Sequence, residues 1–231
     1  MKLMVGLLKP NSGTVSLFGE AIGDKKAEDL SRQISLVYQN PEEMFIKDSI
    51  RADIAYAMEV RNVPEWEKRT AELLERFRLA ELQDRDGRLM SGGQMRRASL
   101  AIGVALNPGV LLLDEPLGAL DLRLRKDMQI ELKRIQQQMG ITFIYVTHDQ
   151  EEALTMSDTV VVMDKGRIQQ IGTPEDIYNE PKNAFVADFI GESNILNGTM
   201  VRDNVVKMYG KEFPCVDGGF APNAVSYTHL R

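Results

Sequence analysis

The chain has 231 residues, 43% of them hydrophobic, and a formal net charge of −6. This length has room for one large domain plus part of another, and the acidic balance argues against nucleic-acid binding, which normally leaves a basic surface. Cys215 is the single cysteine, which excludes an internal disulfide and fits a reducing compartment. No apolar run approaches the roughly 18 residues that a membrane span needs, and residues 1–3 do not begin a signal peptide, so membrane association is expected to be peripheral.

Residues 1–8 are mostly apolar and predict the end of a helix that Pro10 and Gly13 terminate. A strand over residues 14–18 and a helix over residues 25–32 follow, and a second strand over residues 34–38 ends at Gln39. The side-chain amide oxygen of Gln39 can bind Mg²⁺ or a water molecule. The same pattern is also typical of an ordinary strand-to-helix turn.

Residues 42–89 become charged and helical. The predicted helix over residues 66–79 has one apolar face, and a solvated amphipathic helix packed on its neighbours explains that face.

A second helix starts at residues 90–94, Met-Ser-Gly-Gly-Gln, and is expected to run to about residue 106. Ser91 is a good N-cap, and Gly92 and Gly93 let backbone N–H groups approach an anion at the positive end of the helix dipole. A capped helix start without a ligand is the alternative.

Residues 110–115 combine four apolar residues with two adjacent carboxylates, Asp114 and Glu115. This pattern predicts a buried parallel strand that presents charge at its carboxyl edge, where open α/β sheets bind ligands. Asp114 can reach Mg²⁺ through its water shell, and Glu115 can orient or deprotonate an attacking water. Taken alone, the pattern fits equally a core strand whose acids cap the next helix.

The helix after residue 121 has an apolar core face and is expected to end at Gly140. The strand over residues 141–146 leads to His148, and a lone histidine beside a strand is usually structural. A hairpin over residues 158–171 precedes a helix that Thr173 caps. From residue 194 the pattern turns to short strands.

These motifs together resemble the nucleotide-binding subunit of an ABC transporter over nearly the whole chain. The resemblance rests on a Q-loop (Gln39), a signature motif (residues 90–94), Walker B (residues 110–115), a D-loop (residues 118–121) and an H-loop (residues 147–149). It implies an α/β fold, the P-loop NTPase (RecA-like) ABC ATPase core, over residues 1–190. Within that core, residues of about 42–98 form a helical subdomain. Residues 191–231 would be a truncated C-terminal β-barrel, expected to be frayed or badly paired because it is too short to close.

The resemblance also implies the cofactors ATP and Mg²⁺ and assigns the site residues. The catalytic residues are Glu115, His148 and Gln39, and the metal-binding residues are Asp114 and Gln39. The residues that would close on the nucleotide held by the opposite subunit are Ser91, Gly92, Gly93, Gln94 and, at the subunit crossing point, Asp121.

The partners that the resemblance implies are a second ATPase subunit in a dimer, membrane-spanning permease subunits and, indirectly, an extracytoplasmic substrate-binding protein, with no nucleic acid. A coupling helix of the permease would dock near residues 39–46. The implied location is the cytoplasmic face of the bacterial plasma membrane, peripherally bound.

Two importer subfamilies compete. Residues 113–215 are similar to the ATPase of spermidine/putrescine importers, whereas residues 38–48 are more similar to the ATPases of energy-coupling-factor vitamin or metal-ion importers. A chimeric reading frame is one hypothesis for this difference. Residues 222–231 match neither pattern, and His229 is expected to be exposed and inert.

Two other functions stay open. A non-catalytic ABC subunit could lend only its signature motif to a complete partner. Ribosome or DNA-repair ABC proteins use the same ATPase heads, but they usually carry tandem heads or a long coiled coil, and the sequence has neither pattern.

The phosphate loop of the family, a Gly-rich turn that ends in Gly-Lys-Ser/Thr, is not in the sequence. We expect the chain to begin just after that loop, with Met1 an internal methionine of a longer gene. Because the lysine and the Mg²⁺-binding hydroxyl supply much of the catalysis, these 231 residues alone should not hydrolyse ATP. A phosphate-release assay tests this, and activity that disappears in Glu115→Gln would contradict it.

Overall fold

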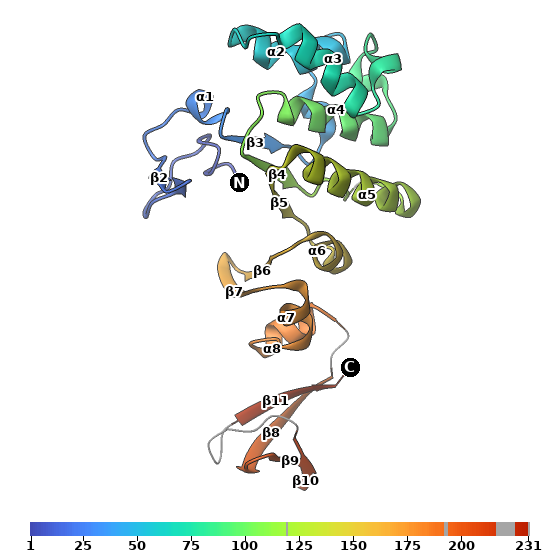
Figure 1. Cartoon of the computed structure of the whole chain (residues 1–231). Coiled ribbons are helices and arrows are strands. Elements are labelled where there is room, and N and C mark those ends of the chain that lie inside the picture. The colour runs from blue at the N-terminus through green and yellow to red at the C-terminus, as the bar shows by residue number, and fades with distance from the viewer. Residues whose placement is uncertain (119, 192–193, 216–224, 231) are drawn as a thin grey trace. The chain divides into compact units, whose positions relative to one another are not determined.

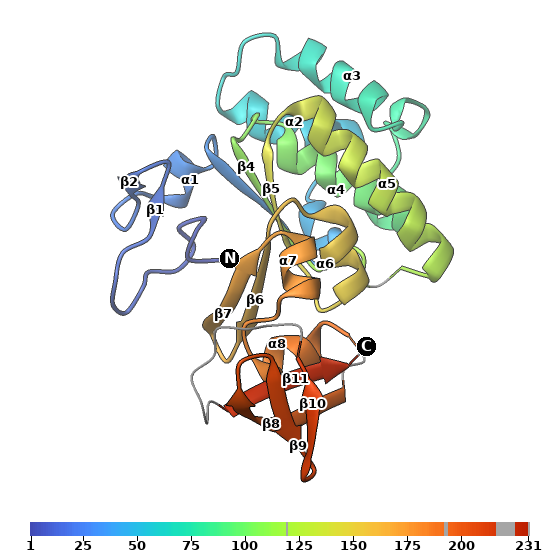
Figure 2. The same ribbon diagram turned by 60° about the horizontal axis from the view of Figure 1, so that its bottom comes forward.

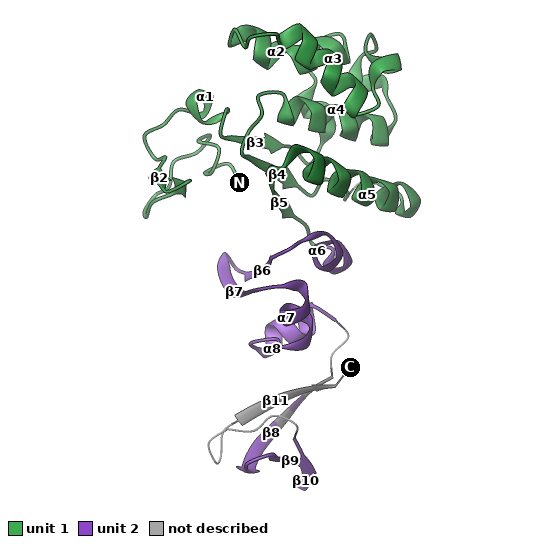
Figure 3. Cartoon of the chain, in the orientation of Figure 1, with its two compact units in different colours: residues 1–148 green, residues 149–231 purple. Residues whose placement is uncertain are grey.

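The computed structural model describes the chain except residues 119, 192–193, 216–224 and 231, and it describes only the backbone of residues 194, 195, 197 and 225–230 (Figure 1). Residue 119 of the D-loop and the side chain of His229 therefore lie outside the described part, and the predictions for them stay predictions. The chain forms two compact units, residues 1–148 and 149–231 (Figure 3). The expected boundary near residue 190 stays a prediction.

The first unit is built on a three-stranded parallel sheet, in the order β3 (Ile34–Val37), β4 (Val110–Asp114), β5 (Thr142–Val146). The pairs Val37 with Leu113 and Asp114 with Val146 set the register. The four apolar residues of β4 are buried, as its sequence predicts for a central parallel strand.

The helical part contains η1 (Pro41–Met44), α2 (Ile50–Val60), α3 (Trp66–Arg76), η2 (Ala80–Leu82), η3 (Gly87–Leu89), α4 (Gly92–Val104) and α5 (Leu122–Met139). The predicted apolar face of α3 is buried at Thr70, Leu73 and Leu74. Gly140 ends α5 with φ 63°, the left-handed conformation that glycine adopts without strain.

The two faces of the sheet are covered by different segments. Residues 1–30, with β1 (Ser16–Leu17), β2 (Glu20–Ala21) and α1 (Ala27–Leu30), pack against one face, where Ile34 and Leu112 are buried with Val5 and Leu30. Helix α4 packs against the other face. Helices α2 to α5 accordingly lie to one side of the sheet in both views (Figures 1 and 2).

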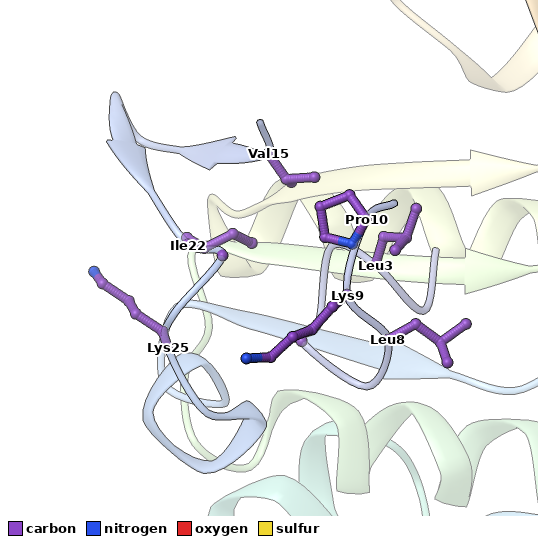
Figure 4. A pocket seen from close by; sticks show the side chains of 9 residues that line it. Leu3, Leu8, Lys9, Pro10, Val15, Ile22 and Lys25 are labelled. Carbon is purple, nitrogen blue, oxygen red and sulfur yellow. The ribbon is translucent and has the colours of Figure 1, made fainter. Parts of the chain in front are cut away.

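The predicted helix over residues 1–8 is wrong, because these residues form a series of turns. Gly6 has φ +73°, a left-handed conformation that interrupts a helix, and the chain turns there so that Val5 packs with Leu30 and Leu112. The N–H of Met4 donates to the carbonyl of Met1, and Val5 packs into the core. The chain then curves around a small pocket between Leu8, Pro10, Val15 and other residues (Figure 4).

The second unit contains α6 (Gln150–Met156), the antiparallel hairpin β6 (Val160–Asp164) and β7 (Arg167–Gly172), α7 (Pro174–Asn179) and α8 (Ala184–Phe189). Thr173 caps α7 in a capping box with Asp176, as predicted.

The predicted frayed end of the second unit is also wrong. Strands β8 (Asn194–Arg202), β9 (Val205–Met208), β10 (Lys211–Pro214) and β11 (Val225–Leu230) form one antiparallel sheet in the order β10-β9-β8-β11. Strand β11, whose residues fit neither sequence pattern, pairs with β8 along its whole length. Met200, Val206 and Met208 give the sheet a small buried cluster, so pairing and packing support each other.

The contact of α4 with the sheet depends on Gly103. A Cβ atom on Gly103 would lie 2.7 Å from Val37 Cγ2 and 3.1 Å from Leu111 Cδ1. Gly103→Ala should therefore lower the free energy of unfolding by about 1–3 kcal/mol, more than the gain in helix propensity. Urea unfolding followed by Trp66 fluorescence measures this change. Gly23→Ala, at a position with open space, is the control and should be nearly neutral; a more stable Gly103→Ala protein would contradict the packing argument.

Candidate functional site

The carboxyl ends of the three parallel strands bring Gln39, Glu115 and His148 together. Gln39 follows β3, Glu115 follows β4 and His148 follows β5, so the parallel register places all three at one edge of the sheet. Gln39 Nε2 donates to Glu115 Oε2 at 2.8 Å, and His148 Nδ1 lies 3.1 Å from Glu115 Oε1. We call these three residues the catalytic cluster, after the role that the sequence analysis predicts for them.

Glu115 is the centre of the catalytic cluster and has an unusual backbone. Its φ of 41° lies in the left-handed region, which is uncommon for residues other than glycine and costs of order 1–3 kcal/mol. The N–H of Glu115 donates to the carbonyl of Val146 at 2.9 Å, and its own carbonyl accepts from Gly118 at 3.2 Å. These bonds hold a sharp turn directly after β4. The side chain of Glu115 is 29% exposed and that of His148 is 74% exposed, so water can reach both.

Asp114 is the last residue of β4 and is half-buried. Among the described residues, no group of three His, Cys, Asp or Glu side chains is placed to hold a metal ion. Mg²⁺ at phosphate sites usually has only one or two carboxylate ligands, with the remaining ligands from phosphate and water. Asp114 and the amide of Gln39 fit that chemistry.

The signature segment, residues 90–94, begins α4 as predicted. Ser91 Oγ accepts the N–H of Gln94 at 3.4 Å, and Gln94 Oε1 accepts the N–H of Ser91 at 3.1 Å, which completes a capping box. Each side chain therefore accepts the backbone N–H of the other residue at the helix start. No hydrogen bond among the described residues joins this segment to the catalytic cluster.

The two glycines of the signature segment differ. A Cβ on Gly93 would lie 2.9 Å from Leu124 Cδ1, whereas a Cβ on Gly92 would be at an ordinary 3.5 Å from Leu120. Gly93 thus lies closer to α5 than Gly92 does, and a larger residue there would have to displace the end of the Leu124 side chain. Asp121 caps α5 through the N–H of Leu124 at 2.9 Å, and its predicted role between subunits stays a prediction.

Arg96 is a residue of the site that the sequence analysis missed. Its side chain is buried in α4, where Nη1 donates to the carbonyl of Tyr38 at 3.0 Å and Nη2 donates to the carbonyl of Gln39 at 2.8 Å. Burial lowers the pKa of Arg96 to about 10. The signal in the sequence was an arginine among the small and apolar residues of the buried helix face, next to Ala98 and Leu100.

A second surface lies beside the Q-loop. Asp53 of α2 accepts the N–H groups of Ile46 at 2.8 Å and Lys47 at 2.9 Å and so shapes the segment of residues 45–48. Phe45 is buried against Gly87, where a Cβ would lie 2.5 Å from the ring. The side chain of Ile46 points into solvent. Ile46, Tyr56 and Leu89 are exposed large hydrophobic residues of this region, and we call them the docking surface because a permease helix is predicted to dock near residues 39–46.

Comparison with known proteins identifies the family. A family model described as ABC transporter matches residues 1–118, which hold the Gln39, signature and Walker B segments. The chain belongs to the ABC transporter family. The cbiO1 structure from Clostridium perfringens, part of the ABC transporter complex cbiONQ, matches 78% of this chain and 73% of its own with a TM-score of 0.71 and 30% identity. The α/β fold of a P-loop NTPase is thereby confirmed.

Relatives of this ABC family member are named spermidine/putrescine import ATP-binding protein PotA. The protein of Clostridium novyi is 51% identical over 225 residues, which are 96% of this chain and 64% of that protein. The protein of Bacteroides fragilis is 47% identical over 225 residues, which are 96% of this chain and 48% of that protein. This chain therefore spans about half to two thirds of the length of these relatives.

The alignments also bear on the chimera hypothesis. A single relative aligns with 96% of the chain, including residues 38–48 as well as most of the later part. Both suggested parents are homologous ABC ATPases, and either would align along the whole of such a chain, so the chimeric reading frame stays a hypothesis.

The buried Asp53 gives a prediction that depends on pH. Burial raises the pKa of Asp53, so the folded state holds this proton more tightly than the unfolded state, and the wild type gains stability relative to an uncharged variant as pH falls. Asp53→Asn keeps an oxygen for the two N–H groups and removes the charge. It should be more stable than the wild type at pH 7, with the advantage shrinking toward pH 4.

Urea unfolding of both proteins at several pH values measures this difference. Asp24→Asn, which removes an exposed carboxylate, is the control and should show no such trend. An Asp53→Asn protein that is less stable at every pH would show that the charge-assisted hydrogen bonds outweigh desolvation.

Proposed function

We propose that this chain is a part, without the phosphate loop, of the ATP-binding and ATP-hydrolysing subunit of an ABC importer. The observation that carries the proposal is the carboxylate of Glu115, placed between Gln39 and His148 at the carboxyl edge of a parallel sheet. A carboxylate with an amide and an imidazole around it can hold a water molecule, orient it and take its proton.

Each residue of the catalytic cluster has a part in this proposal. Glu115 accepts the proton of the attacking water, and its fixed turn keeps the carboxylate at the edge. Gln39 and His148 hold the water by hydrogen bonds, and His148 is exposed enough to meet a phosphate. Asp114 and Gln39 would hold Mg²⁺, and ATP bound with that ion would supply the phosphoryl group that the water receives.

The proposal includes a dimer. Ser91, Gly92, Gly93 and Gln94 begin α4, where the helix dipole and the first N–H groups favour a phosphate brought by a second subunit. Binding of ATP between two subunits would hold them together, and hydrolysis would release them. Asp121 lies at the start of the next helix, where the subunits would cross.

We further propose a peripheral place on the cytoplasmic face of the bacterial membrane. The docking surface would receive a cytoplasmic helix of a permease subunit, because three exposed apolar side chains suit the apolar face of an amphipathic helix. An extracytoplasmic binding protein would contact only the permease. No helix in the described part of the chain is long and apolar enough to cross a bilayer.

Polyamines are the proposed cargo. The relatives named spermidine/putrescine import ATP-binding protein PotA are 47–51% identical over 225 residues, whereas the cbiO1 structure is 30% identical. An energy-coupling-factor importer is the second candidate, supported by the similarity of residues 38–48 to the ATPases of such importers. Uptake of labelled spermidine and putrescine into cells that carry the transporter tests the cargo. Uptake of a vitamin or metal ion, with none of polyamine, would favour the second candidate.

Hydrolysis is tested with the transporter assembled from the full gene and its permease subunits. Glu115→Gln keeps the shape of the side chain but removes its basicity, so kcat should fall by about 10²–10⁴ while ATP still binds. Phosphate release and nucleotide binding are measured on the same preparation. Glu59→Gln, at an exposed position on α2, is the control and should be as active as the wild type. An active Glu115→Gln transporter would mean that Glu115 is not the base.

A further inference from the structure

Arg96 is a buried cation without an acidic partner. Its side chain is 2% exposed, and no carboxylate among the described residues lies within salt-bridge distance of its guanidinium. Two backbone carbonyls accept its hydrogen bonds, and its Nε has no partner. Burying an unpaired charge costs several kcal/mol. An apolar residue would fill the same space without that cost, so the position calls for a functional reason.

The place of Arg96 on its helix makes the cost larger. Arg96 is the fifth residue of α4, close to the end where the helix dipole disfavours a cation. Arg69 of α3 is the opposite case. Its Nε donates to the carbonyl of Ala105 at 2.8 Å, at the C-terminal end of α4, where the helix dipole favours a cation. Arg69 is explained as a helix cap. Arg96 is not.

The two carbonyls that Arg96 holds lie beyond the sheet. The ladder between β3 and β4 ends at Val37, so the peptide groups of Tyr38 and Gln39 have no strand neighbour to fix them. The planar guanidinium of Arg96 donates to both carbonyls, which fixes the orientation of these two peptide groups as well as their position. The side chain of Gln39 then reaches Glu115 Oε2. A continuous set of bonds therefore runs from α4 through Arg96 and Gln39 to Glu115.

We propose that Arg96 is a positioning residue that holds Gln39 against Glu115 and links it to the helix of the signature segment. Arg96 acts through the backbone of residues 38 and 39 and does not touch the reacting atoms. This inference rests on the proposed ATPase function. It explains why a charge is kept in the core of the first unit, at the point where the last strand residue gives way to the Q-loop.

The first test is a double-mutant cycle on the transporter assembled from the full gene and its permease subunits. Arg96→Met removes both hydrogen bonds and the charge and keeps an unbranched side chain, and kcat should fall about 10–100-fold, with KM for ATP changing less than about threefold. In a Gln39→Ala background the same substitution should change kcat less than about twofold, because its target is already gone. Equal losses in both backgrounds would overturn the proposal.

The control for this cycle is Arg69→Met, which also removes an arginine that binds backbone carbonyls of α4. It should lower stability but leave kcat within about twofold. If Arg69→Met lowered kcat as much as Arg96→Met, a general loss of helix packing would explain both, and the positioning role would fall. Should Arg96→Met not fold, Arg96→Gln, which also removes the charge but keeps a polar side chain, takes its place.

The second test does not depend on activity. Hydrogen exchange of the backbone amides of residues 38–45 should become at least about tenfold faster in Arg96→Met, and it should not change in Arg69→Met. Unchanged exchange in Arg96→Met would overturn the proposal that Arg96 holds the backbone of the Q-loop. An inactive wild-type transporter would overturn the proposed ATPase function, and with it the predicted effect of Arg96 on kcat. The exchange result would still decide whether Arg96 holds residues 38 and 39.

Discussion

The parallel register of three short strands is the constraint on which the site depends. Val37 pairs with Leu113, and Asp114 pairs with Val146, so the three chain segments leave the sheet at the same edge. Gln39, Glu115 and His148 are far apart in the sequence, but each lies only one or two residues beyond the end of its strand, so the three come together. A slip of one residue would turn every side chain of the strand to the other face and separate the cluster. A slip toward the interior would also move the charged Asp114 into the buried stretch of β4, which is unfavourable.

The site also contains unfavourable local structure that the surrounding core has to stabilise. Glu115 has a left-handed backbone, and Arg96 carries a buried charge at the unfavourable end of a helix. Both features lie within one hydrogen bond of Gln39. Their concentration around one side chain indicates that geometry at this edge matters more than local stability. The packed sheet next to it, with Leu111 and Leu112 fully buried, can support that cost.

The sequence predicts the parts of this structure that arise from local patterns. Strands, the capped start of α4 and the end of α5 at Gly140 follow from apolar runs, a serine N-cap and a glycine C-cap. Arg96 could not be assigned, because an arginine on a helix usually faces solvent and its two partners are backbone atoms some 57 residues away. The predictions for residues 1–8 and for β11 were wrong for the same reason, because both structures depend on contacts with distant segments.

Helix α4 connects the separate features of the site because it is rigid over its length. The capping box at Ser91 lies about 7.5 Å along the axis from Arg96, and Arg96 lies about 10 Å from Gly103, which packs on Val37 and Leu111. The helix therefore contacts the strand β3 near its end and the Q-loop just beyond it. A displacement of the Ser91 end has to carry the carbonyls of residues 38 and 39 with it or break the bonds of Arg96. Because Gly103 packs closely on Val37 and Leu111, and Gln39 binds Glu115, any such displacement would act on the distance between Gln39 and Glu115.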